Sequence, residues 1–193
     1  MTSRWIEAVS VDRDLVVDWQ PISLLFKNEM QPDNPYYPSV SRTRDLLRVI
    51  ESVRAAGHAE RIGDLYTEFG RRIHNDAAPD FDVAPVLVQL GINPSHAAAL
   101  DDDTFDAVIR ERMAVGLALT GPDVGTPLIA IEKADGKQVG FFGPVITTFP
   151  ERDAAAALWD GFVAMANHDG FFELKRTRTT APDKPPVATP RSS

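Results

Sequence analysis

Thr126 and Pro127 could present backbone atoms to a ligand. They follow Gly125 and precede the apolar run Leu128-Ile129-Ala130-Ile131, which predicts a β-strand with a proline at its entry. Proline cannot donate to a strand ladder, so this backbone is either an ordinary turn into the strand or an edge where an extended substrate can pair. Taken without any further motif, these residues favour the ordinary turn.

A second pair, His74 and Asn75, ends a helix that is predicted to begin near Ala59. A histidine near a helix C-terminus is favoured by the helix dipole, and asparagine tolerates the left-handed cap conformation, so both can be plain helix-ending residues. A place in a substrate pocket is an equally good interpretation. No second histidine or carboxylate stands at a metal-ligand spacing from His74, and we predict no metal site.

The composition excludes several classes of protein. A chain of 193 residues with 44% hydrophobic residues can bury a core without disulfides. Its formal net charge of −8 disfavours nucleic acid or an anionic membrane surface as the main partner. No apolar run approaches the ~20 residues that span a bilayer, and the N-terminus lacks a signal-peptide core, so we expect a cytoplasmic protein. With no cysteine, the chain can form neither disulfides nor thiolate metal sites.

The chain is predicted to begin with a helix and then a strand. Thr2 or Ser3 can cap the helix, and its apolar residues fall on one face. The strand covers residues 15–19, with Pro21 limiting its extension. The residues expected on the buried face of the helix are Trp5, Ile6 and Val9.

Residues 41–119 form a predicted helical block, preceded by a proline-rich and tyrosine-rich loop over 31–38. Apolar residues recur there at steps of three and four, as one face of a helix requires. Helices are expected from Ser41 to Gly57, from Ala59 to Asn75, after a cap at Asp82, over residues 95–100, and after Asp103 or Thr104.

Two further strands are predicted after the helical block. Residues 128–131 and 138–142 are strand-like, and Asp135-Gly136 between them is a strong hairpin signal. With the strand near the start of the chain, the sheet would have three strands. The sequence leaves open which strand the hairpin pairs with.

A final amphipathic helix is predicted from Pro150 to about Asn167, with Leu158, Phe162 and Met165 facing inward. Beyond it, residues 179–193 are rich in proline, threonine and serine and have little to bury. We expect them to form a disordered tail.

Four stretches of the chain occur together in the order and spacing of a known family. They are Thr2-Ser3-Arg4-Trp5-Ile6; Gly70-Arg71-Arg72-Ile73-His74-Asn75; Asp123-Val124-Gly125-Thr126-Pro127 with Phe141-Phe142-Gly143-Pro144; and the run from Phe171 to Thr179. Over nearly its whole length the chain resembles the DsbA-like thioredoxin-fold proteins, and among them the mycothiol-dependent nitroreductase branch. The resemblance implies an α/β, thioredoxin-like (DsbA-type) fold, with one domain over 1–178 and a helical insertion over about 41–119.

The same resemblance places a first strand and a Cys-Pro-Trp redox motif immediately before the segment that begins at Thr2. Both are missing from this chain. In the family the cysteine lies at a helix N-terminus, where the helix dipole and free N–H groups favour the thiolate. We therefore expect Met1 to be an internal methionine of a longer reading frame, with a genuinely shortened protein as the alternative. As it stands, the chain is expected to be silent in thiol exchange and only marginally folded.

The resemblance also implies roles for residues that are present. Gly125, Thr126 and Pro127, with a cis peptide bond before the proline, form a substrate-binding wall, and His74 and Asn75 are placed in the substrate pocket. The implied activity is that of a thiol-disulfide oxidoreductase or mycothiol-dependent nitroreductase, without a bound cofactor and with mycothiol as thiol co-substrate. The implied partners are a low-molecular-weight thiol and a small disulfide or nitroaromatic substrate. No catalytic residue is assigned within the chain.

Two other classes of function stay open at this point. One is a non-redox binding or scaffold protein that keeps a thioredoxin-like pocket, which the absence of cysteine favours. The other is a relative of the kappa-class glutathione transferases and isomerases, in which a bound thiol rather than a protein cysteine does the chemistry.

Overall fold

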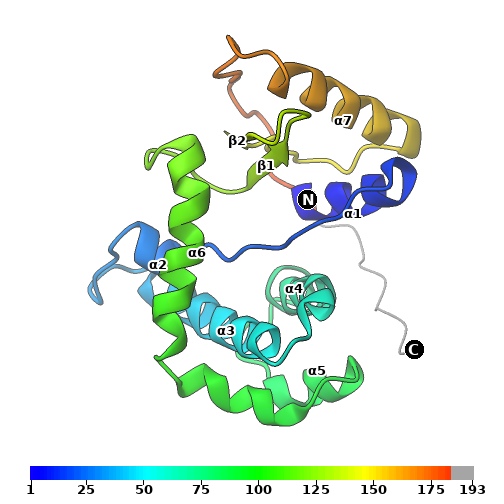
Figure 1. Cartoon of the computed structure of the whole chain (residues 1–193). Helices are drawn as coiled ribbons and strands as arrows, with labels where there is room; N and C mark the ends of the chain where they lie inside the picture. Colours follow the sequence, from blue (N-terminus) through cyan, green and yellow to red (C-terminus); the bar gives the residue numbers. More distant parts are fainter. Residues whose placement is uncertain (184–193) are drawn as a thin grey trace. The chain divides into compact units, whose positions relative to one another are not determined.

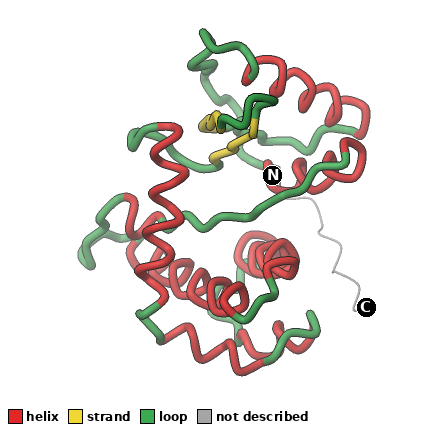
Figure 2. Tube along the Cα trace, viewed as in Figure 1, coloured by secondary structure: helices red, strands yellow, loops and turns green. Residues whose placement is uncertain are grey.

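The computed structural model describes residues 1–183, which divide into two compact units. The first unit comprises residues 1–18 and 114–183, and the second comprises residues 19–113. Helices predominate, and the two strands of the described residues form one antiparallel sheet (Figure 1, Figure 2). The chain is therefore a mixed α/β structure, as predicted at this coarse level.

The first unit consists of two packed helices, a β-hairpin and the end of a third helix. Its elements are α1 (Thr2–Arg13), β1 (Leu128–Glu132), β2 (Gln138–Phe142) and α7 (Arg152–Ala166). In Figure 1, α1 and α7 lie side by side, and hydrogen bonds between them support this arrangement. The hairpin pairs Leu128 with Phe142 and closes around Gly136, whose φ is 79°. The predicted hairpin is confirmed, and its turn needs glycine because φ is positive there.

Trp5 lies at the centre of the core of the first unit. Its side chain is fully buried, and its indole N–H donates a hydrogen bond to the Ala155 carbonyl at 2.9 Å. The Trp5 and Trp159 ring centroids are 5.9 Å apart, and Phe162 connects Trp159 to Phe141 of the hairpin. All three α1 residues that were predicted to face inward are buried. An aromatic cluster thus joins α1, α7 and one face of the sheet.

The last two turns of α6 (Phe105–Thr120) cover the opposite face of the hairpin. The Leu128 side chain reaches to 3.5 Å from the position that a Cβ on Gly116 would occupy. A Cβ on Gly140 would lie 2.7 Å from the Leu119 Cβ, which real Cβ atoms do not tolerate. Glycine at position 140 therefore allows α6 to approach the strand.

We expect Gly140→Ala to lower the free energy of unfolding by about 1–3 kcal/mol, the usual effect of overpacking a tight contact. The clash involves a carbon attached directly to the α6 backbone, so a side-chain rotation cannot relieve it. Calorimetry or urea unfolding measures the change. Gly161→Ala is the matched control, because an added Cβ there meets nothing within 4 Å and alanine has the higher helix propensity. An equal loss in both variants would contradict the importance of this close approach.

The second unit is entirely helical within the described residues. Its elements are α2 (Leu24–Lys27), α3 (Tyr37–Ala55), the 3₁₀ turn η1 (Ala59–Arg61), α4 (Ile62–Gly70), the π-helical turn η2 (Arg71–Asn75), α5 (Val83–Gln89), the 3₁₀ helix η3 (Pro94–Asp101) and the start of α6. The apolar stripes of α3, α4 and α5 meet in one core. Its fully buried members include Val49, Val53, Leu65 and Leu87. The predicted helical block is confirmed.

Local sequence signals set several ends of these helices. Gly57 and Gly91 follow α3 and α5 with φ of 89° and 69°, a region that non-glycine residues rarely adopt. The Asp82 carboxylate accepts a hydrogen bond from the Ala84 N–H at 3.1 Å and caps α5, as predicted. The α3 helix begins at Tyr37, inside the predicted loop, because Pro38 is tolerated in a first helical turn.

A buried ion pair connects α3 to α6 in the second unit. The Arg48 guanidinium donates to both carboxylate oxygens of Asp106, at 2.7 and 2.8 Å, and to the Leu100 carbonyl at 3.0 Å. Burial alone would raise the pKa of Asp106, but the hydrogen bonds and charges of Arg48 and Arg44 outweigh it and lower that pKa. The pair stays ionised at neutral pH and fixes the start of α6 against α3.

The predicted strand over residues 15–19 is wrong. These residues form no regular element, and Val16 is almost completely exposed. A strand exists only with a ladder partner, and among the described residues β1 and β2 pair only with each other. The sheet consequently has two strands instead of the expected three.

Two side-chain predictions are also wrong. Thr2 and Ser3 do not cap α1, because the helix already begins at Thr2. In α7, Leu158 is exposed, whereas its neighbour Trp159 faces the core, because Trp5 packs at that position of the helix. The inward position of Phe162 is confirmed.

The single domain over 1–178 with its insertion over 41–119 stays a prediction. Of the predicted tail, residues 179–183 contain no helix or strand, and residues 184–193 lie outside the described residues. Over residues 1–183, no helix has both the length and the apolar character needed to cross a bilayer.

Candidate functional site

Gly125, Thr126 and Pro127 lie together in the loop that leads from α6 into β1. Gly125 and Thr126 are exposed and Pro127 is half-buried, and the Thr126–Pro127 peptide bond is cis. The Gly143 N–H donates to the Pro127 carbonyl at 2.9 Å, which extends the hairpin pairing by one residue. The Thr126 backbone has no hydrogen-bond partner among residues 1–183. Its N–H and carbonyl are available to a ligand.

The amino end of α1 is connected to this loop through Pro144. The Thr2 hydroxyl donates to the Pro144 carbonyl at 2.8 Å. The residue before Pro144 is Gly143, whose N–H donates a hydrogen bond to the Pro127 carbonyl. The Ile146 N–H approaches the Thr2 hydroxyl oxygen at 3.5 Å. Two hydrogen bonds and one covalent connection therefore place the start of α1 and the Gly125–Pro127 loop at the same end of the hairpin.

The Phe142 ring packs against the backbone of this loop. A Cβ on Gly125 would lie 3.2 Å from Cε2 of Phe142, so the absence of a side chain at residue 125 lets the ring approach. Phe142 remains 46% exposed. Sequence reasoning placed Phe142 in a family motif but gave it no role at the site. The hairpin register, which pairs Phe142 with the first residue of β1, is the signal that could have found it.

His74 and Asn75 lie in η2, at the end of α4. His74 is exposed and Asn75 is half-buried. They belong to the second compact unit, whereas Gly125, Thr126 and Pro127 belong to the first. The five predicted site residues thus form two groups, one in each compact unit.

A family model described as Rv2466c-like, mycothiol-dependent nitroreductase Rv2466c, matches residues 1–176. The match includes both groups of predicted site residues and the start of α1. The chain belongs to this family. Membership of the Rv2466c-like family confirms the nitroreductase part of the resemblance and supports a thiol-dependent oxidoreductase function with a low-molecular-weight thiol as partner. The roles of the individual site residues stay predictions.

In this member of the Rv2466c-like family, a buried carboxylate holds the turn that carries His74. Glu68, on the last turn of α4, is fully buried and accepts hydrogen bonds from Arg71 at 2.8 and 3.1 Å and from Arg72. Burial would raise the pKa of Glu68, but the hydrogen bonds and charges of the two arginines outweigh it and lower the pKa. The carboxylate is ionised at neutral pH and fixes the first two residues of η2.

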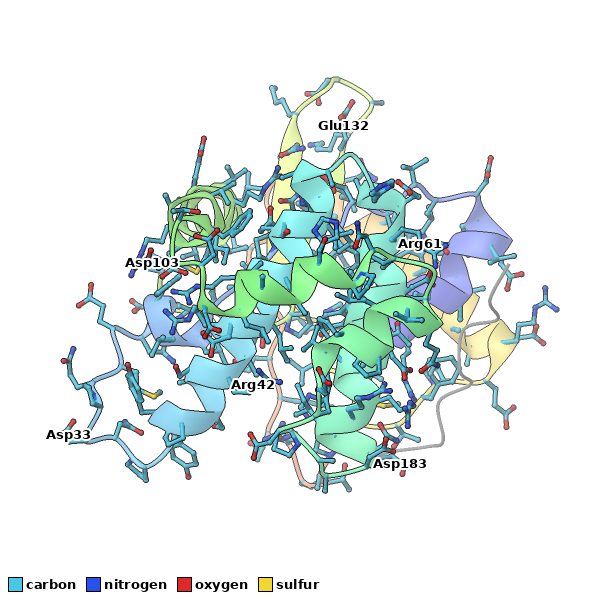
Figure 3. All side chains as sticks on the ribbon, turned by 90° about the horizontal axis from the view of Figure 1, so that it is seen from below. Asp33, Arg42, Arg61, Asp103, Glu132 and Asp183 are labelled. Carbon is cyan, nitrogen blue, oxygen red and sulfur yellow. The ribbon has the colours of Figure 1, made fainter. Side chains whose placement is uncertain are left out.

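Phe81 supports the same turn from the other side of Arg72. The guanidinium carbons of Arg72 and Arg42 lie 5.4 and 5.5 Å from the centre of the Phe81 ring, within the range of cation–π contacts. Arg42, on α3 (Figure 3), also donates to the Phe81 carbonyl at 2.8 Å. These arginines are occupied by structural contacts, so they position η2 and are not free to bind an anion.

Across residues 1–183, no group of three or more His, Asp or Glu side chains is arranged to hold a metal ion. The Rv2466c-like family is mycothiol-dependent, which is consistent with mycothiol as a thiol partner.

Proposed function

We propose that this protein is a thioredoxin-like, DsbA-type oxidoreductase that uses mycothiol to reduce a small disulfide or nitroaromatic substrate. One observation carries the proposal: the amino end of α1 and the Gly125–Pro127 loop meet at one end of the hairpin through Gly143 and Pro144. A helix amino end stabilises a thiolate, and an unpaired strand edge binds an extended substrate. The chemistry therefore needs these two features next to each other.

The proposal includes a first strand and a Cys-Pro-Trp motif encoded immediately before Thr2. Two stretches of the first unit support it. Residues 15–17 form no strand, and β1 pairs only with β2 among the described residues. An added strand would give both stretches a partner, as a thioredoxin-like sheet requires.

In the proposed reaction, the cysteine thiolate at the start of α1 and one small thiol together lose two electrons to the substrate and form a mixed disulfide. A second small thiol then attacks the mixed disulfide, releasing the cysteine thiolate and forming the small-thiol disulfide. Each cycle oxidises two thiols to one disulfide and yields two electrons and two protons. These convert a disulfide substrate to two thiols, or a nitro group to a nitroso group and water. Thr126 would pair its backbone with the extended thiol or disulfide, while His74 and Asn75 would line the pocket.

The alternatives receive no support from the family match. Neither a non-redox scaffold nor a kappa-class transferase is indicated by the family to which the chain belongs.

Extending the reading frame upstream tests the proposal directly. We expect the extended protein to reduce a nitroaromatic with mycothiol, and we expect the 193-residue chain to stay at the uncatalysed rate because it has no thiolate. Loss of nitroaromatic absorbance measures the rate. Replacing the added cysteine by serine is the control and should return the rate to background. A stop codon just upstream of Met1, or equal rates for the long and short proteins, would contradict the proposal.

A further inference from the structure

We propose that Phe142 determines substrate specificity at the Gly125–Pro127 loop, by giving a planar aromatic ring a surface on which to stack. The inference rests on the proposed function and deepens it, since it names the residue that prefers an aromatic over an aliphatic substrate. The arrangement that motivates it is the half-exposed Phe142 ring beside a backbone that has no hydrogen-bond partner among residues 1–183.

The hairpin fixes where the Phe142 ring can lie. Phe142 is the last residue of β2 and stands opposite Leu128, so its side chain leaves the sheet on the face opposite to that of Phe141. The N–H of the next residue, Gly143, donates a hydrogen bond to the Pro127 carbonyl, which fixes the end of β2 to the loop. The position of the ring is therefore set by backbone pairing.

Gly125 brings the ring into contact with the loop. An ideal Cβ at residue 125 would lie 3.2 Å from Cε2 and 3.5 Å from Cζ of the ring, and the first of these distances is tighter than most Cβ contacts. The φ of Gly125 does not require glycine, since the chain's positive-φ glycines do not include it. The space that it leaves for Phe142 is thus a physical reason for glycine at this site.

The exposure of Phe142 distinguishes it from its neighbour. Phe141 packs against Phe162 and Phe171, with ring centroids 5.9 and 5.8 Å apart, whereas Phe142 leaves almost half its surface to solvent. A single exposed hydrophobic residue is ordinary on a protein surface. Phe142 differs because it lies next to a backbone segment, Gly125-Thr126, that is exposed and has no partner within the described part of the chain. A ligand that bonds this segment would also cover the ring.

A flat π-system gains more from this surface than a saturated ring does. Aromatic pairs prefer offset or edge-to-face contacts, and they are stabilised by more than the burial of their surface area alone. This additional free energy corresponds to roughly a five-fold difference in affinity. When the aromatic ring of the substrate stacks on Phe142, the oxygens of its nitro group stay free to accept a hydrogen bond from the Thr126 N–H. Phe142 would then select the ring, and the loop would bind the polar group.

The test measures binding to the 193-residue chain without any thiol. Nitrobenzene and nitrocyclohexane are titrated separately while the amide NMR signals of Gly125 and Thr126 are followed. We expect nitrobenzene to bind about five-fold more tightly and to shift both signals. Phe142→Leu should abolish this preference, and Phe142→Tyr should retain it because the ring is kept. Phe172→Leu is the matched control, since Phe172 is 83% exposed and lies outside the hairpin, and it should leave the preference unchanged.

The inference is wrong if nitrobenzene does not shift these amides, or if Phe142→Leu keeps the aromatic preference. Kinetics of the upstream-extended protein separate it from the proposed function. An aromatic preference in binding without mycothiol-dependent turnover supports the role of Phe142 and contradicts the oxidoreductase proposal alone. Mycothiol-dependent turnover whose aromatic preference is the same in the wild type and in Phe142→Leu overturns the specificity role alone.

Discussion

Replacing Glu68 by glutamine is expected to lower the free energy of unfolding of the second compact unit by about 3 kcal/mol, the low end for removing one partner of a buried ion pair. Glu68 is completely buried and accepts hydrogen bonds from both Arg71 and Arg72. A neutral amide removes the buried negative charge that both arginines share, so Arg71 keeps only its ion pair with Asp76 and Arg72 loses its carboxylate partner. Urea unfolding, together with hydrogen exchange of the α4 amides, measures the loss.

Glu60→Gln is the matched control for this substitution. The Glu60 side chain is 65% exposed, and its nearest ionic contact is His58 at 3.6 Å. Exposed pairs of this kind contribute little, so the control should change stability by less than about 0.5 kcal/mol. Equal effects of the two substitutions would show that the buried position of Glu68 has no special importance.

The pH dependence of the Glu68 effect follows from the direction of its pKa. The pKa of this carboxyl is lowered in the folded protein, so its stabilising contribution is complete above the unfolded-state value of about 4.3 and is lost as the pH falls through the folded-state pKa. Wild type and Glu68→Gln should therefore differ most near neutral pH. The difference should shrink as the pH falls below the unfolded-state value of about 4.3 and disappear below the folded-state pKa.

The helices could be predicted because their apolar residues recur along the chain itself. Periodicity at Trp5, Ile6 and Val9 identified the buried face of α1, and the Asp82 signal identified the start of α5. Residues 15–19 have the composition of a strand but lack a partner in the described chain. The sequence of a segment shows that it can be a strand, and its ladder partner decides whether it becomes one.

The candidate site shows a similar division between local and non-local information. The loop Gly125-Thr126-Pro127 was found because it is contiguous and resembles a family motif. The Thr2–Pro144 hydrogen bond joins residues that are far apart in sequence, so no local pattern reveals it. The spacing of Glu68 from its two arginines is visible in the sequence, but the burial that makes the cluster important is set by the packing of α4 on the core.

Trp5→Ala is expected to lower the free energy of unfolding of the first unit by about 3–5 kcal/mol, which is the cost of removing a large buried aromatic side chain. The Trp5 ring is fully buried and packs against Trp159, and its N–H is bonded to the Ala155 carbonyl. The substitution removes a buried contact between α1 and α7 and leaves the exposed ion pairs Arg13–Asp160 and Asp12–Arg152. At about 2–4 °C per kcal/mol, the midpoint of thermal unfolding should fall by roughly 10 °C.

Trp5→Phe separates the two contributions of the tryptophan. Phenylalanine keeps an apolar ring beside Trp159 but cannot donate a hydrogen bond to the Ala155 carbonyl. Trp5→Phe should therefore lower the free energy of unfolding by at most about half as much as Trp5→Ala does. Phe172→Ala, at an exposed position of the same unit, should leave stability nearly unchanged. If Trp5→Phe were as damaging as Trp5→Ala, the hydrogen bond to α7 would matter more than the packing. If neither substitution altered unfolding, α1 would not depend on Trp5 for its position, and the alignment of its amino end with the Gly125–Pro127 loop would need another cause.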